Sequence, residues 1–83
     1  MNAVVDDDLE LRRLRWRCRR GMLENDLLLE RFLDRYARTL DAPTRRQLGE
    51  LLEIDDPTLW RLLSGQARAE SALQRLVERI RDA

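Results

Sequence analysis

Residues 28–40, which read LLERFLDRYARTL, decide the fold of this 83-residue chain. Their apolar residues recur at spacings of three and four, which places them on one stripe of an α-helix. No segment of the chain alternates apolar and polar residues with period two, as a half-buried β-strand does. We therefore predict an all-α fold with a core helix from about Met22 to Leu40. The stripe consists of Leu28, Leu29, Phe32, Leu33, Tyr36, Ala37 and Leu40.

A first helix is expected before this core helix, from about Leu9 to Arg20. One stripe of this helix, built from residues three, four and seven apart, is apolar. Leu9 and Trp16 fall nearly opposite that stripe, so the helix has two apolar sides. We expect both sides to be buried in the bundle; the alternative is that Trp16 faces a partner. The stripe itself consists of Leu11, Leu14 and Cys18.

Capping residues predict where several helices begin and end. Gly21 is a stop for the first helix, because glycine adopts the left-handed conformation that ends helices. Asp41, with Pro43 in the first turn, is typical of the start of a third helix. Asp56 with Pro57 repeats that pattern for a fourth helix.

The fourth helix is expected to end at Ser64-Gly65 and the fifth to span about Arg68 to Asp82, which completes a compact five-helix bundle. With 43% apolar and 39% charged residues, residues 8–83 form one small folded domain. Residues 1–7 lack periodicity and are expected to be a flexible acidic tail. Since the bundle uses every long apolar stripe, we expect a monomer until it meets a partner, with no direct membrane insertion.

Ordinary catalytic groups are scarce in this composition. The sequence has no histidine, all 16 of its basic residues are arginine, and Cys18 is its one thiol. The usual general base and Schiff-base amine are absent, which argues against an enzyme. A metal site of His and Cys is excluded, and Asp6-Asp7-Asp8 is interpreted as a solvated acidic tail. A lone cysteine and the absence of a signal pattern indicate the bacterial cytoplasm.

Six arginines crowd residues 12–20, directly before Gly21 and Glu24. They form a solvated face, a basic helix that binds nucleic acid in a small regulator, or a protein-binding surface. Zero net charge weakens the nucleic-acid interpretation. The protein-binding interpretation also explains Gly21, because a glycine lets a partner's backbone approach. Glu24 is explained either by such a partner or by the positive end of the second helix.

The segment Arg20-Gly21-x-x-Glu24 matches the RGxxE signature of the small succinate dehydrogenase assembly factors, which promote covalent attachment of FAD to the flavoprotein subunit. Its setting is similar to that family as well, with Trp16 and Cys18 before it and Asp26 after it. A second stretch, residues 51–60 reading LLEIDDPTLW, resembles the family's LLExDDPxL followed by an aromatic residue. The resemblance covers about residues 11–81, and the five-helix bundle that it implies agrees with the periodicity.

The resemblance implies an assembly chaperone without catalysis of its own. Such a chaperone engages the flavoprotein subunit of succinate dehydrogenase, with fumarate reductase as a further candidate, so that the partner's own histidine attacks the flavin. FAD is attached to the partner, and no cofactor is bound stably by this chain. By position, Arg20, Gly21 and Glu24 would lie in the partner interface. Weaker candidates for that interface are Arg19, Asp26 and the pair Asp55 and Asp56, which helix capping also explains.

Overall fold

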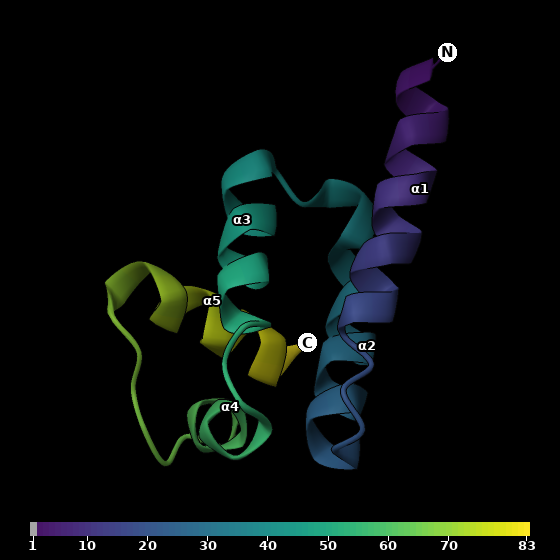
Figure 1. Cartoon of the computed structure of the whole chain (residues 1–83). Helices are drawn as coiled ribbons and strands as arrows, with labels where there is room; N and C mark the ends of the chain where they lie inside the picture. The colour runs from purple at the N-terminus through teal and green to yellow at the C-terminus, as the bar shows by residue number, and fades with distance from the viewer. Residues whose placement is uncertain (1) are drawn as a thin grey trace.

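Five α-helices make up most of the chain in a computed structural model, which describes the backbone of residues 2–83 and the side chains from Leu9 onward (Figure 1). These described residues contain no β-strand, and the all-α prediction is confirmed. The elements are α1 (Asn2–Arg17), α2 (Leu23–Tyr36), the 3-10 turn η1 (Ala37–Thr39), α3 (Ala42–Leu51), α4 (Asp56–Leu63) and α5 (Ser71–Asp82).

Helices α2, α3 and α4 each pack on α5, and α2 also packs on α4. In Figure 1, α1 and α2 lie on the right of the molecule and the other three helices on the left. None of the helices in the described part of the chain combines the length and the hydrophobicity that crossing a bilayer requires.

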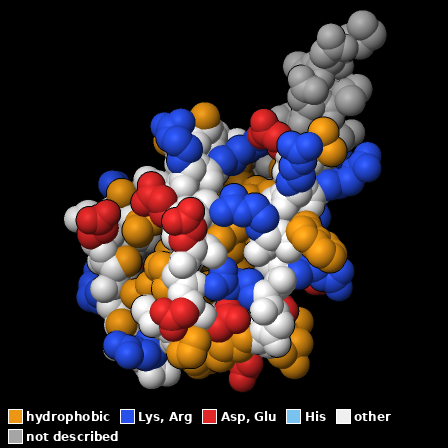
Figure 2. Space-filling model, viewed as in Figure 1, with side chains coloured by type: hydrophobic (Ala, Val, Ile, Leu, Met, Phe, Trp, Pro, Cys, Tyr) orange, Lys and Arg blue, Asp and Glu red, His pale blue; other side chains and the backbone are white. Residues whose placement is uncertain are grey.

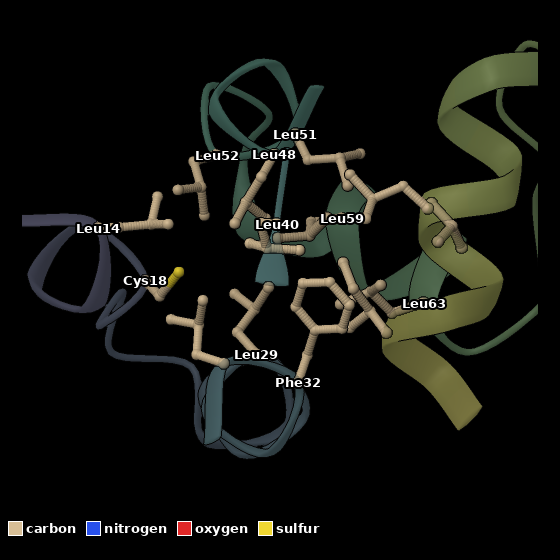
Figure 3. Close-up of a cluster of buried hydrophobic side chains, with 14 of the residues drawn as sticks. Leu14, Cys18, Leu29, Phe32, Leu40, Leu48, Leu51, Leu52, Leu59 and Leu63 are labelled. Carbon is tan, nitrogen blue, oxygen red and sulfur yellow. The ribbon is translucent and has the colours of Figure 1, made fainter. Parts of the chain in front are cut away.

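The core is formed by the apolar stripes that the sequence predicts. Leu29, Phe32 and Leu33 of α2 are almost completely buried, and leucines of α3 and α4 meet them from the opposite side (Figure 3). Figure 3 also shows Leu14 of α1 and Cys18, the residue that follows α1, pointing toward this cluster. These contacts attach α1 to the bundle along one side of the helix.

The second apolar side of α1 is exposed, so the expectation that both sides are buried is wrong. The Trp16 side chain is 73% exposed and Leu9 is 43% exposed, whereas Leu11, Leu14 and Cys18 are buried. The reason is the position of α1 at the edge of the bundle, where none of the described elements covers its outer side.

Several helix boundaries differ from those expected. Helix α1 ends at Arg17 and not at about Arg20, so Gly21 lies in the connection to α2 and is not the helix stop. The core helix ends at Tyr36, after which the chain tightens into η1. Helix α5 begins at Ser71 and not at Arg68, because the Gln74 side chain accepts the backbone N–H of Ala69 and holds the preceding residues outside the helix. Helix α1 begins at Asn2.

The expected flexible acidic tail at residues 1–7 lies outside the residues whose side chains are described, and its flexibility stays a prediction. At α3 the expected cap is confirmed, since the Asp41 carboxylate accepts the N–H of Thr44 at 2.9 Å. At α4 the cap is Asp55, one residue before the Asp56 that we expected. The end of α4 is confirmed: Gly65 has a φ of 88°, and the N–H groups of Gly65 and Gln66 return to Leu62 and Arg61.

Candidate functional site

The connection between α1 and α2 is built around Gly21, which has a φ of 100°. That conformation favours glycine, because a Cβ atom is disfavoured in the left-handed region. A Cβ atom built on Gly21 would have no heavy atom within 4 Å, so the space beside this residue is open. Gly21 is therefore required by the backbone and also presents an unobstructed surface.

Asp26 holds this connection from the side of α2. Its carboxylate accepts the backbone N–H of Arg20 at 2.8 Å and that of Gly21 at 3.1 Å. Asp26 lies one turn into α2, and Met22, the residue before the helix, makes no side-chain cap. The carboxylate consequently binds N–H groups ahead of the helix and fixes the path of the chain through Gly21.

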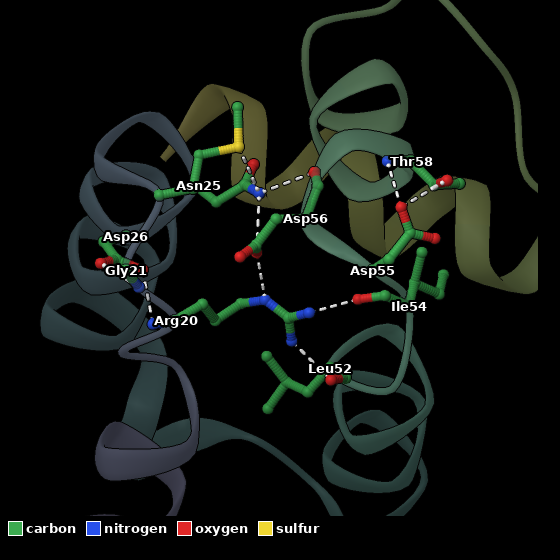
Figure 4. Close-up of polar contacts among 10 residues, drawn as sticks. Arg20, Gly21, Asn25, Asp26, Leu52, Ile54, Asp55, Asp56 and Thr58 are labelled. Carbon is green, nitrogen blue, oxygen red and sulfur yellow. Dashed lines mark hydrogen bonds and ion pairs between the residues drawn. The ribbon is translucent and has the colours of Figure 1, made fainter.

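The Arg20 guanidinium points away from solvent, toward the connection between α3 and α4 (Figure 4). Its Nε donates to the Asp56 carboxylate, and its two terminal nitrogens donate to the carbonyl oxygens of Leu52 and Ile54. The Arg20 side chain is 14% exposed and that of Asp56 is 27% exposed. Arg20 thus joins two segments of the chain that lie more than 30 residues apart.

Asn25 of α2 also binds Asp56, the residue whose carboxylate Arg20 contacts. The Asn25 side chain is completely buried, and its Nδ2 donates to the backbone oxygen of Asp56 at 3.1 Å and to the Asp56 carboxylate at 3.3 Å. We refer to the side chains of Arg20, Asn25, Asp26 and Asp56 as the Arg20 cluster. Sequence reasoning missed Asn25; its place on the same helical stripe as Leu29 and Phe32 was the available signal of burial.

The predicted site residues divide into a bonded group and an exposed group. Arg20, Asp26 and Asp56 come together in the Arg20 cluster, where all three bind other parts of the chain. Gly21, Glu24 and Arg19 lie beside that cluster and are exposed.

Asp55 is the one predicted site residue that lies outside both groups. It faces away from the Arg20 cluster and accepts the N–H and the hydroxyl of Thr58 (Figure 4). These hydrogen bonds lower the pKa of the Asp55 carboxyl below its usual value.

The large exposed apolar side chains of the described residues all belong to α1 and α2. They are Leu9, Trp16, Leu23 and Leu27, and the last two are 65% and 54% exposed. Figure 2 shows hydrophobic side chains at the surface over α1 and around the N-terminal end of α2, among basic and acidic ones. Exposed apolar and arginine side chains in one area are typical of protein-binding surfaces.

A groove of about 380 Å³ separates α1 from α2. Arg15 and Arg19 line one side of the groove, while Leu23, Leu27 and several acidic residues line the other side. A salt bridge of 2.9 Å between Arg15 and Asp34 links the two sides of the groove. We call this feature the α1–α2 groove, and its residues Arg19 and Leu23 are each two positions from Gly21 in sequence.

The chemistry available at this site is that of recognition. Cys18 lines the α1–α2 groove, but burial raises the pKa of its thiol to about 11, so the thiol is protonated at neutral pH. Among the residues whose side chains are described, no three His, Cys, Asp or Glu residues are grouped so that they could hold a metal ion. The groups available for binding lie at the turn through Gly21, where the exposed carboxylate of Glu24 lies next to arginine and apolar side chains.

The sequence matches known proteins over most of its length. The model of a family described as flavinator of succinate dehydrogenase matches residues 12–83. A protein of Legionella pneumophila (strain Paris) named FAD assembly factor SdhE is 43% identical over 79 residues, which is 92% of this chain and 96% of the relative. A protein of the same name from Coxiella burnetii is 40% identical over 68 residues, or 82% of this chain and 83% of the relative. No solved structure matches the chain significantly.

Proposed function

Because the chain belongs to the family of succinate dehydrogenase flavinators, we propose that it binds the flavoprotein subunit of succinate dehydrogenase and promotes covalent attachment of FAD to that subunit. The relatives carry the name FAD assembly factor, so the prediction of an assembly factor in place of an enzyme is confirmed at the level of the family. The observation that carries the proposal is the family match across residues 12–83, which includes the complete Arg20-Gly21-x-x-Glu24 segment.

The surface around Gly21 supports a role in binding a protein. Gly21 and Glu24 are exposed at a turn whose backbone is fixed, and Leu23 and Leu27 add apolar area next to them. Fixed exposed groups lose little conformational freedom on binding, which favours affinity. We assign Gly21, Glu24 and Arg19 to direct contact with the flavoprotein, with Leu23 and Leu27 as apolar contacts.

The structure also bears on the alternative of a small nucleic-acid-binding regulator. Arg15 and Arg20, two of the six arginines that suggested it, are bonded to acidic groups of the same chain. Binding through phosphates requires free cations; Arg20 is held inside the chain and does not supply one, and Arg15 is engaged in an exposed ion pair. With family membership added, the assembly factor is the function that the observations favour.

The proposal extends to the clients of the chain, its cofactor, its cellular location and its oligomeric state. Fumarate reductase, whose flavoprotein is related, is a second candidate client. The chain holds no FAD stably, since the flavin is attached to the partner. The chain acts in the bacterial cytoplasm, and it is a monomer until it binds the flavoprotein.

The proposal is tested in a strain that lacks this gene and is complemented with variants. We expect the flavoprotein subunit of the deletion strain to lack covalent FAD fluorescence on a denaturing gel, and the wild-type gene to restore that fluorescence. Glu24→Gln should fail to restore it, because the carboxylate that meets the partner is lost while stability changes by only about 0.3–1 kcal/mol.

Glu50→Gln is the matched control, since Glu50 is also an exposed glutamate but belongs to α3 and not to the turn. This control should restore full fluorescence. Normal covalent FAD in the deletion strain, in a genome without a second gene of the family, would sink the proposed function.

A further inference from the structure

We propose that Arg20 is a positioning residue that acts inside the chain, and that the flavoprotein meets the turn that Arg20 holds and not Arg20 itself. The inference rests on the proposed function, and it assigns separate tasks to the residues of the Arg20-Gly21-x-x-Glu24 segment. Arg20 fixes the turn to the rest of the bundle, while Gly21 and Glu24 are the groups that the partner touches.

The Arg20 guanidinium is fully occupied within the chain. All three of its nitrogens donate to acceptors of the same chain: the Asp56 carboxylate and the carbonyl oxygens of Leu52 and Ile54. The side chain is 14% exposed. A partner carboxylate would need a free edge of the planar fork for a bidentate contact, and each edge already has a bonded acceptor.

The acceptors that Arg20 binds lie at the junction of two helices. Leu52 is the C-terminal cap residue of α3, and Asp56 is the first residue of α4. Helix C-terminal carbonyls lack intrahelical partners and favour a nearby cation. Arg20 meets that requirement for α3 and also neutralises the carboxylate that begins α4.

The backbone of Arg20 is fixed by a second helix, α2. Asp26 accepts the N–H groups of Arg20 and Gly21, while the guanidinium of Arg20 binds the α3–α4 connection. The turn is therefore held between α2 and the α3–α4 connection. Glu24, in the first turn of α2, takes a defined place relative to α4 as a consequence.

The contacts of Arg20 explain why two stretches of the sequence that are far apart act together. The segment that starts at Arg20 and the stretch LLEIDDP at residues 51–57 are separate in the chain. In the structure, Leu52, Ile54 and Asp56 of the second stretch supply the acceptors for Arg20 of the first. The two stretches form one unit, in which residues 51–57 support the surface that Gly21 and Glu24 present.

The test measures the affinity of purified variants for the flavoprotein subunit, well below their melting temperatures, at several salt concentrations. We expect Arg20→Lys and Arg20→Gln each to weaken binding by about tenfold or more. Lysine keeps the charge but cannot reach three acceptors arranged around a planar fork. Asp56→Asn should also weaken binding, and the Arg20→Gln/Asp56→Asn double variant should bind no more weakly than Arg20→Gln alone.

Arg19→Gln is the matched control, because Arg19 is the exposed neighbour of Arg20 and lines the α1–α2 groove. Loss of the Arg19 charge should reduce the salt dependence of binding, as the loss of a charge at an interface does. The Arg20 variants should leave the salt dependence unchanged. Wild-type affinity in Arg20→Lys, additive losses in the double variant, or a reduced salt dependence in Arg20→Gln would each overturn the inference.

A measurement on the free chain separates this inference from the proposed function. In NMR spectra, Arg20→Lys and Asp56→Asn should shift the amide signals of Gly21 and Glu24 while the signals of α5 stay in place. Unmoved Gly21 and Glu24 signals would overturn the positioning role whatever the partner is. Failure of the wild-type chain to bind the flavoprotein, with these shifts present, would instead refute the proposed function alone.

Discussion

Gly21 shows how one residue meets a requirement of the fold and a requirement of binding at the same position. Its φ of 100° is a demand of the backbone, because the turn must redirect the chain within a few residues of α1. The open space beside its Cα is a separate property of the surface. The two properties respond differently to substitution, so experiment can separate them.

We predict that Gly21→Ala and Gly21→Arg lose similar stability but differ in binding. Each substitution places a Cβ atom at a positive φ, which costs about 1–2 kcal/mol, and neither Cβ atom meets a neighbouring atom. Alanine adds little bulk and should keep most of the affinity for the flavoprotein. Arginine covers the contact surface and should abolish binding.

Thermal melts and pull-downs of the flavoprotein check this pair of variants. If Gly21→Ala loses binding as completely as Gly21→Arg at equal folded fraction, the backbone conformation is the requirement and open space is not.

At the scale of the elements, α1 has one side that serves the fold and one side that the fold does not use. Leu14 is buried against the bundle, while Trp16, two residues later, is 73% exposed. A tryptophan this exposed buries little of its area in the free chain, and tryptophan is enriched among the residues that dominate binding energies. We therefore interpret the outer side of α1 as part of the surface that meets the flavoprotein.

We predict opposite effects for the two substitutions on α1. Leu14→Ala should lower the free energy of unfolding by about 2 kcal/mol or more, through lost burial and a cavity. Trp16→Ala should change stability by less than about 0.5 kcal/mol, as surface substitutions do, and should weaken binding to the flavoprotein. Denaturant unfolding and affinity measurements check both values. A large loss of stability in Trp16→Ala would contradict the exposed position of this residue.

At the scale of the whole molecule, the attachment of α1 to the bundle closes the core over Cys18. Burial is the main cause of the raised pKa of its thiol, about 11 against an ordinary value of 9.0, and the neighbouring arginines oppose that rise only in part. The thiol is then protonated and covered in the folded state. Its reactivity consequently reports whether α1 is docked.

We predict that iodoacetamide modifies Cys18 slowly in the native chain at pH 7 and rapidly in denaturant. The reactive species is the thiolate, so the native rate should rise only as the pH approaches 11. Because the folded-state pKa lies above the unfolded value, the stability that the protonated thiol contributes is present below pH 9 and is lost as the pH rises toward 11. Mass spectrometry of alkylated protein checks these rates; fast modification of the native chain at pH 7 would show that α1 does not cover Cys18.

The sequence by itself determined the class of the fold and the core of the bundle. Apolar spacing identified Leu29, Phe32 and Leu33 as buried residues of α2 but missed the polar Asn25, because the spacing of apolar residues along the chain reflects which side of a helix is buried. The cap at Asp41 and the end of α4 at Gly65 were also predictable, since both depend on a few adjacent residues. The RGxxE segment, together with its setting and the stretch at residues 51–60, indicated the family that the comparisons establish.

Only the tertiary structure decided what the site residues do. Sequence grouped Arg20 with Gly21 and Glu24 as contacts for a partner, yet the guanidinium of Arg20 turns inward to acceptors at residues 52–56. Spacing also suggested that Trp16 is buried, and it is exposed. The local pattern of residues specifies which face of a helix is apolar. The packing of helices that are far apart in the chain decides whether another element covers that face. The same packing decides which distant carbonyl oxygen an arginine reaches.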